Sequence, residues 1–230
     1  MKTIAIMQPY LFPYIGYYQL ARCVDEFVLF DDVNYRKKSY INRNSILKNG
    51  NACPFSIPVR AISQNKKIWE HEYVNEFDGF LQILSLAYKD APHFNEIYAL
   101  VQEVLKSKSS GVTEVNSLSI RLVFDYLNLE SNMSWASSMA ISPEIKSKNR
   151  IIEICERKGA GTYVNAIGGQ DLYDRSEFLR HGINLKFLKT LSNSYCQGGC
   201  DFRPHLSMLD VLMWNDKAKV NELLTQYELI

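Results

Sequence analysis

Short apolar runs that stop at proline or charged residues dominate the start of the chain. One run covers residues 3–7 and ends before Pro9, and a second covers residues 26–30 and ends at Asp31. Runs of about four to eight apolar residues with such boundaries are typical of buried strands. Residues 15–22 between them carry apolar side chains at helical spacing. The chain therefore opens as strand, helix, strand, which is the beginning of a parallel α/β sheet.

Apolar side chains in the middle of the chain recur at intervals of three and four residues, which predicts three helices between residues 77 and 128. The other expected elements are strands at 133–137, 162–164 and 183–188, extended edge segments at 54–59 and 68–74, and helices at 148–158 and 206–214. The pattern predicts a single domain, residues 1–230, of the α/β class. Its layered, mainly parallel sheet has flanking helices and an inserted helical segment at 77–128.

Composition is that of a folded globular protein, with 47% hydrophobic and 22% charged residues. No apolar run is long enough to span a membrane and no signal-peptide pattern is present, so a cytoplasmic location is expected. Five cysteines are expected to be reduced thiols. Cys196 and Cys200 form a C-x3-C pair, but only His205 stands near them. A closed zinc site needs four ligands, so no metal is expected.

The net charge of +1 hides a local asymmetry. Residues 33–69 contain no acidic side chain and eight lysines and arginines. Such a surplus focuses a field on an anionic ligand, and the alternative is a solvated basic face. A nucleic-acid partner is not indicated, because the whole chain is not basic and carries no recognisable nucleic-acid-binding module.

The segment after the first expected strand concentrates aromatic side chains in a stiff loop. Two prolines fix backbone torsions there, and Gly16 lets a ligand or another backbone approach closely. Loops that follow the carboxyl ends of parallel strands carry the ligands of α/β folds. Gln8, Tyr10 and Tyr14 are therefore candidate substrate-binding residues. The alternative is a tight turn packed with aromatic core residues.

A second polar cluster follows the second expected strand. Adjacent strand residues point to opposite faces, so Asp31 and Asp32 are not expected to share one site. One is expected to be functional and the other to be a cap or an ion-pair partner. Cations and amides downstream suit phosphate groups and sugar hydroxyls. The candidate substrate-binding residues in this cluster are Lys37, Asn42, Arg43 and Asn44.

A third cluster joins a strand end to a Gly-Gly turn at the start of a helix. Amide groups in such a turn hold anions, which makes Asn165, Gly168 and Gly169 candidates for substrate binding. The lysine of a phosphate-binding loop is missing, and a structural turn is an equal alternative. Among the four histidines, His205 stands out because it precedes an apolar helix, with Asp210 five residues further on.

Together these motifs resemble the signature of the WbqC-like family, over essentially the whole chain. The resemblance rests on Gln8-Pro9-Tyr10 with Pro13 and Gly16, Asp31-Asp32 with Lys37 and Asn42-Arg43-Asn44, and the string from Pro204 to Asp210. Family members occur in bacterial gene clusters for O-antigen and other surface polysaccharides. The role suggested for some of them is transfer of glycine or a related acyl unit onto an amino sugar. Many members carry histidine where this chain has Met7, so here any proton acceptor has to come from another position.

The resemblance implies an acyltransferase of surface-polysaccharide (lipopolysaccharide) biosynthesis that transfers glycine or a related acyl or aminoacyl unit to the amine of a nucleotide-linked amino sugar. Lys37 and Arg43 would bind the diphosphate, and an aromatic side chain of the first loop would stack on the base or sugar. Asp32 or His205 would accept the proton of the amine as catalytic base. The donor stays open between an aminoacyl-tRNA, an acyl-CoA and an adenylate, and so do any cofactor and a homodimer. Two alternatives also remain: a nucleotidyltransferase-like enzyme, and a non-catalytic scaffold that binds a sugar nucleotide.

Overall fold

Parallel strand pairing organises the chain. A computed structural model describes residues 1–191, 194–199 and 201–230. It contains a six-stranded sheet in the order β5-β2-β1-β6-β7-β8, in which every pair is parallel except the antiparallel pair β7–β8. The strands are β1 (Lys2–Met7), β2 (Glu26–Leu29), β5 (Met133–Trp135), β6 (Ala160–Ala166), β7 (Asn184–Thr190) and β8 (Tyr227–Leu229). The α/β class with a mainly parallel sheet and flanking helices is confirmed.

Helices cover both faces of this sheet. In β1, Ile4 and Ile6 face one helical layer, whereas Ala5 faces the other. Because both faces are covered, the central strands are continuously apolar and do not alternate with polar residues. The first layer contains α5 (Ser147–Arg157) and α6 (Arg175–Arg180), and the second contains α1 (Ile15–Arg22), α4 (Val112–Tyr126), α7 (Met208–Trp214) and α8 (Lys217–Leu223).

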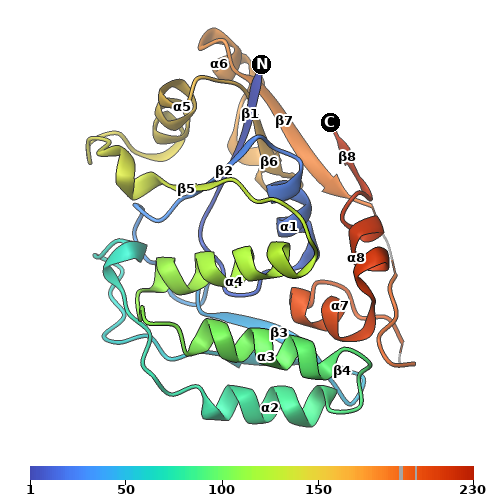
Figure 1. Cartoon of the computed structure of the whole chain (residues 1–230). Helices are drawn as coiled ribbons and strands as arrows, with labels where there is room; N and C mark the ends of the chain where they lie inside the picture. Colours follow the sequence, from blue (N-terminus) through green and yellow to red (C-terminus); the bar gives the residue numbers. More distant parts are fainter. Residues whose placement is uncertain (192–193, 200) are drawn as a thin grey trace.

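The predicted helical segment at 77–128 extends the second layer outwards. Figure 1 shows α4, then α3 (Phe94–Leu105), then α2 (Asp78–Tyr88) at increasing distance from the sheet. Their apolar faces belong to the same core cluster as the α1 side of the sheet. The description of this segment as an insertion in a single domain stays a prediction.

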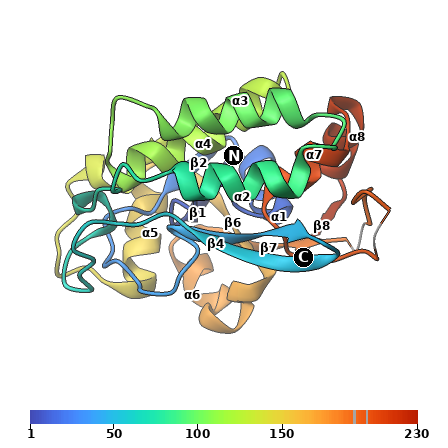
Figure 2. The same cartoon turned by 90° about the horizontal axis from the view of Figure 1, so that it is seen from below.

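A β-hairpin that the sequence analysis did not predict packs against these helices. It consists of β3 (Arg43–Lys48) and β4 (Asn51–Ser56), and Figure 2 shows it beneath α2. Asn49 and Gly50 form its turn with φ values of 52° and 71°, the positive angles that two-residue hairpin turns require. The prediction of an edge segment at 54–59 agrees with this two-stranded sheet.

Three short helical turns and two further elements differ from the sequence expectations. Only part of the segment expected to be extended at 68–74 is extended: η1 (Ile68–Glu70) is a 3-10 turn, whereas Glu72 and Tyr73 form isolated antiparallel bridges with Gly111 and Val59. The expected strand at 133–137 continues from β5 into the 3-10 turn η2 (Ala136–Met139). A third turn, η3 (Ile167–Leu172), contains the Gly-Gly pair where the start of a helix was expected. The bounds of α6 and the whole of α8 were not predicted. At six and seven residues, α6 and α8 contain fewer than two full helical turns, so the apolar spacing hardly repeats in their sequence.

The start of β2 contains a buried carboxylate with three donors. Burial alone would raise the pKa of Glu26, but Lys158, Lys2 and Ser134 outweigh it and lower the pKa to about 2. Since this is below the unfolded value of about 4.3, the ionised carboxylate stabilises the fold fully above that pH. The stabilisation is lost as the pH falls towards 2.

We therefore expect Glu26→Gln to lower the free energy of unfolding at pH 7 and to have a smaller effect at pH 3. Urea unfolding at the two pH values measures the difference. Glu228→Gln, in the exposed ion pair with Lys189, is the control and should show little effect at either pH. An equal loss for Glu26→Gln at both pH values would contradict the assignment.

Candidate functional site

The direction in which the chain adds strands to the sheet reverses between two neighbouring strands, β1 and β6. From β1 the chain winds through α1 to β2, and from β6 it winds through α6 to β7 on the opposite side. The two helices cover opposite faces. In doubly wound folds, ligands bind outside the carboxyl ends of the strands at such a switch point. Ala5 pairs with Val164, and each strand continues for two more residues before its loop begins, at Gln8 and at Ile167. The two loops therefore leave the sheet side by side.

Tyrosines from two loops gather at this edge. The rings of Tyr10 and Tyr17 lie 5.7 Å apart, and the Tyr10 ring is 5.9 Å from the ring of Tyr40, which follows β2. Tyr17 donates its hydroxyl to the carbonyl of Gln8 at 2.9 Å, which holds the loop against α1. Tyr40 is 55% exposed and Tyr10 is half-buried. The cluster thus offers an aromatic surface next to the strand ends.

A cation lies beside these rings. Burial first and Tyr14 second raise the pKa of Tyr10, whereas Arg36 opposes them and Tyr40 adds to them. Burial and Tyr40 also raise the pKa of Tyr14. Both phenols therefore stay protonated at neutral pH and are available as hydrogen-bond donors, with the guanidinium of Arg36 close by.

Asp31 and Asp32 point to different partners. Ser137 donates both its backbone N–H (2.9 Å) and its hydroxyl (2.7 Å) to Asp31, which caps η2. Burial raises the pKa of Asp31, although the hydrogen bonds from Ser137 oppose it. Asp32 accepts two hydrogen bonds on Oδ2 from Arg150 of α5. The two carboxylates therefore have separate partners, as expected, and a functional role for one of them stays a prediction.

Arg150 contacts only one of the two carboxylate oxygens of Asp32. The Oδ1 atom of Asp32 is buried and has no hydrogen-bond partner among the described residues. Arg150 donates its remaining hydrogen bonds to the carbonyls of residues 141, 142 and 145. The carboxylate therefore lies on the α5 side of the sheet edge, whereas the tyrosine cluster lies on the α1 side.

Four cations near the start of the basic segment have no acidic partner among the described residues. Lys37 and Arg43 are exposed, as are Arg36 and Lys38, and within the described part of the chain none of these four forms an ion pair. Arg43 is the first residue of β3. Such free cations next to a strand edge are available to an anionic ligand.

The two predicted asparagines on either side of Arg43 have structural contacts. Asn42 donates to the carbonyl of Ile57 at 2.8 Å and accepts the hydroxyl of Tyr35 at 2.9 Å. Asn44 is buried and donates to the carbonyl of Phe12 at 2.8 Å, which ties the hairpin to the first loop. Their side-chain amides are engaged by the fold, and a role in substrate binding stays a prediction.

The loop after β6 packs closely around Asn165. This side chain is buried and accepts a hydrogen bond from the N–H of Ala166 at 2.9 Å. A Cβ atom at Gly169 would lie 2.3 Å from Asn165 Nδ2, whereas a Cβ at Gly168 would meet nothing within 4 Å. A Cβ atom at position 169 would therefore have to displace the Asn165 amide, whereas Gly168 leaves its backbone open at the surface.

We expect Gly169→Ala to lower the free energy of unfolding by about 1–3 kcal/mol, because the added methyl group displaces the Asn165 amide. Gly168→Ala is the matched control and should change it by less than about 1 kcal/mol. Thermal and urea unfolding of the two variants measure both effects. Equal losses would show that the contact with Asn165 is not the cause.

His205 lies in the left-handed region, with φ of 62°, and is exposed. Two residues later, Ser207 caps α7 and donates its hydroxyl to Phe12 O at 2.7 Å, and it also forms an isolated bridge with Tyr14. His205 is thus connected to the first loop through the backbone. Of the C-x3-C pair, Cys196 is exposed and Cys200 lies outside the described residues. No cluster of three metal-ligating side chains occurs within the described ranges.

Sequence reasoning missed three residues of this edge. Arg36 and Tyr40 stand within the basic segment that drew attention to Lys37, so their positions were a usable signal. No signal in the sequence pointed to Arg150, since 118 residues separate it from Asp32. The half-buried Met7 packs against the core on the α1 side.

Comparison with known proteins places this architecture in a family. Residues 8–222 match the model of the WbqC-like protein family. The chain belongs to that family. The chain is also similar to a Mycobacterium tuberculosis (strain ATCC 25618 / H37Rv) protein described as "Uncharacterized protein Rv1507c", with 25% identity over 219 residues. The alignment covers 92% of this chain and 93% of the relative, and no solved structure matches. Among the described residues, no helix has the length and apolar character needed to cross a membrane.

Proposed function

We propose that this WbqC-like protein is an acyltransferase that transfers glycine or a related acyl unit to the amine of a nucleotide-linked amino sugar, in the cytoplasmic synthesis of a surface polysaccharide. The observation that carries the proposal is that the loops after β1 and β6 leave the sheet side by side at the switch point. The ring of Tyr40, which follows β2, lies 5.9 Å from the ring of Tyr10, and Arg36 lies near Tyr10. Family membership supports the polysaccharide setting.

The substrate would lie across the carboxyl ends of the strands. Arg43 and Lys37 bind the diphosphate, because they are exposed and no described carboxylate neutralises them. Tyr10 or Tyr14 stacks on the base or the sugar. The turn at Gly168 and Gly169 adds backbone donors on the β6 side.

The chemistry requires a proton acceptor. The amine nitrogen attacks the acyl carbonyl, a C–N bond forms, and the bond between the carbonyl and its leaving group breaks. The nitrogen loses a proton and the leaving group takes one up. Asp32 is the proposed acceptor through its Oδ1 atom, which is buried on the α5 side and has no partner among the described residues, and the amine has to reach it from the tyrosine side. His205 is the second candidate.

Mass spectrometry of 3-amino and 4-amino sugar nucleotides tests the reaction. Each is incubated with the protein and, in turn, with an aminoacyl-tRNA, an acyl-CoA, or an amino acid and ATP. We expect the amino sugar to gain the mass of one acyl unit and the corresponding hydroxyl sugar to gain none. Tight binding with no mass gain from any donor would overturn the enzyme proposal in favour of a scaffold. Pyrophosphate release with nucleotide transfer would indicate a nucleotidyltransferase.

Arg43→Ala should weaken binding of a nucleoside diphosphate sugar by about 1.5–3 kcal/mol, the loss typical of a charged hydrogen bond. Arg43→Lys should also bind more weakly, since the lysine ammonium does not form the bidentate hydrogen bonds that a guanidinium makes with a phosphate. Calorimetry measures both. Arg60→Ala, in the exposed ion pair with Glu72, is the control and should leave the affinity unchanged. Unchanged affinity in a folded Arg43→Ala variant would remove Arg43 from the site.

A further inference from the structure

A groove of about 460 Å³ lies between α4 and β5, apart from the loops described above. β5 is the terminal strand of the six-stranded sheet, so one side of the groove is the edge of the sheet. Figure 1 shows β5 passing above α4, with the two elements running along each other. The groove is open along its length and does not form an enclosed cavity.

The lining of the groove combines apolar surface with hydroxyl groups. Leu118, Met133 and Trp135 supply the apolar part, and Trp135 is 36% exposed. Four serines supply hydroxyls. The only charged side chains in this lining are Glu114 and Arg121, whose charges cancel.

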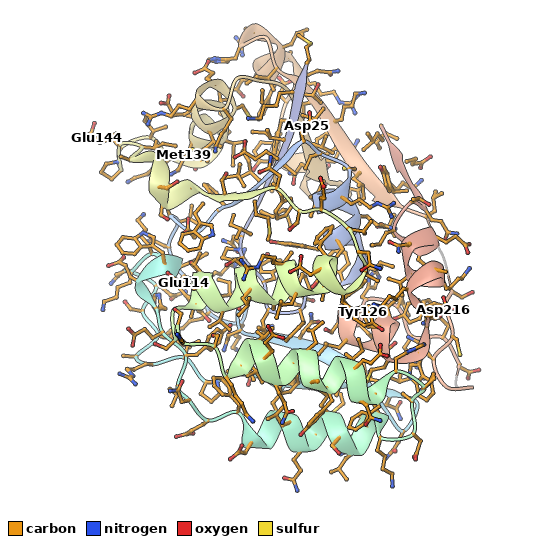
Figure 3. The ribbon with its side chains drawn as sticks, in the orientation of Figure 1. Asp25, Glu114, Tyr126, Met139, Glu144 and Asp216 are labelled. Atoms are coloured by element: carbon orange, nitrogen blue, oxygen red, sulfur yellow. The ribbon has the colours of Figure 1, made fainter. Side chains whose placement is uncertain are left out.

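The two charged side chains of the lining have atoms without a partner among the described residues, and the Glu114 atom is buried, whereas the hydroxyls of Ser107, Ser109 and Ser117 already form hydrogen bonds within the chain. Figure 3 shows Glu114 at the N-terminal end of α4. Its Oε2 atom has no hydrogen-bond partner in the described part of the chain. This carboxylate lies over Gly111, where a Cβ atom would be only 1.9 Å from Oε2. Arg121 is exposed and makes no hydrogen bond or ion pair with any described residue.

This combination selects one class of ligand. A polyanion requires a surplus of cations, and the lining has none. A compact apolar ligand requires an enclosed apolar pocket, which an open groove with serines and two charges does not provide. A pyranose has an apolar face that stacks on an exposed aromatic ring, and its hydroxyls pair with carboxylate, guanidinium and serine groups. We propose that the groove between α4 and β5 binds an uncharged oligosaccharide chain, with one sugar ring on Trp135.

One end of the groove lies near the carboxyl ends of the parallel strands, as the candidate functional site does. Trp135 pairs with Leu29, the last residue of β2, and Ser137 two residues later binds Asp31. A chain seated in the groove would therefore end beside the carboxyl end of β2. The inference rests on the groove alone and does not require acyl transfer.

Saturation-transfer NMR and calorimetry with maltotriose, cellotriose and triacetylchitotriose test the proposal. We expect at least one of the three to bind, and Trp135→Ala to weaken that binding about fivefold or more, because the stacking surface is lost. The matched control is Trp69→Ala, which removes a 50% exposed tryptophan outside the groove and should leave the affinity unchanged. Nucleotide binding at the candidate site should be unaffected by Trp135→Ala.

A second variant keeps the test valid if Trp135→Ala does not fold. Arg121 is exposed on α4, so Arg121→Ala should keep the fold and weaken trisaccharide binding. Arg180→Ala on α6 is the control, which should keep both the fold and the affinity. The proposal is overturned if none of the three trisaccharides binds. It is also overturned if the groove variants bind as well as the controls do, or if extended peptides bind in place of sugars by adding to the edge of β5.

Discussion

Arg150→Ala is expected to lower the free energy of unfolding by about 3–5 kcal/mol, the usual cost of leaving a buried charge without its partner. Both side chains of the Arg150–Asp32 pair are less than one-tenth exposed. The guanidinium also donates to three carbonyls of the segment between η2 and α5. Removing it leaves Asp32 unpaired and releases that segment at the same time. Urea unfolding measures the loss.

Arg157→Ala is the matched control for this experiment. Arg157 is on the same helix and pairs with Glu153, but its side chain is 42% exposed. We expect a loss of about 1 kcal/mol or less. A double variant, Arg150→Met with Asp32→Asn, should lose less than the sum of the two single variants, because the two side chains interact directly. Additive losses, or a loss below about 1 kcal/mol for Arg150→Ala, would contradict the buried ion pair.

Asp32→Asn is expected to reduce turnover of the amino-sugar nucleotide by about a hundredfold or more while changing its affinity much less. The amide keeps the shape of the side chain but does not accept the proton of the attacking amine. Because the change also breaks the buried ion pair with Arg150, turnover is measured per folded molecule. His205→Ala should give a smaller loss. Steady-state kinetics under saturating substrate, together with calorimetry, separate turnover from binding.

Asp31→Asn is the control for Asp32→Asn. It changes the neighbouring carboxylate in the same way, but Asp31 caps η2 through Ser137 and faces other partners. We expect a stability loss with nearly normal turnover in the folded fraction. Full activity of Asp32→Asn would place the proton acceptor elsewhere, even if acyl transfer itself is demonstrated. Loss of nucleotide affinity in parallel with turnover would indicate a binding role for Asp32.

Part of the candidate site could be anticipated because its residues are close in sequence to the ends of strands. Tyr10 follows β1 by three residues and Asp32 follows β2 by three residues, and parallel strands bring their carboxyl ends to one edge. Asn42 and Asn44 show the limit of this reasoning. Their amides look available in sequence, but the hairpin that begins at Arg43 uses them to hold Ile57 and Phe12.

The sequence by itself determined the class of fold, most of its long helices and central strands, and the polar segments that follow β1, β2 and β6. These are local properties, since the spacing of apolar residues reports which side of an element is buried. Only the tertiary structure decided that β1 lies beside β6, that Arg150 pairs with Asp32, and that α4 and β5 line an open groove. Each of these joins segments far apart in the chain. Their pairing depends on how whole elements pack together, which no local pattern of residues encodes.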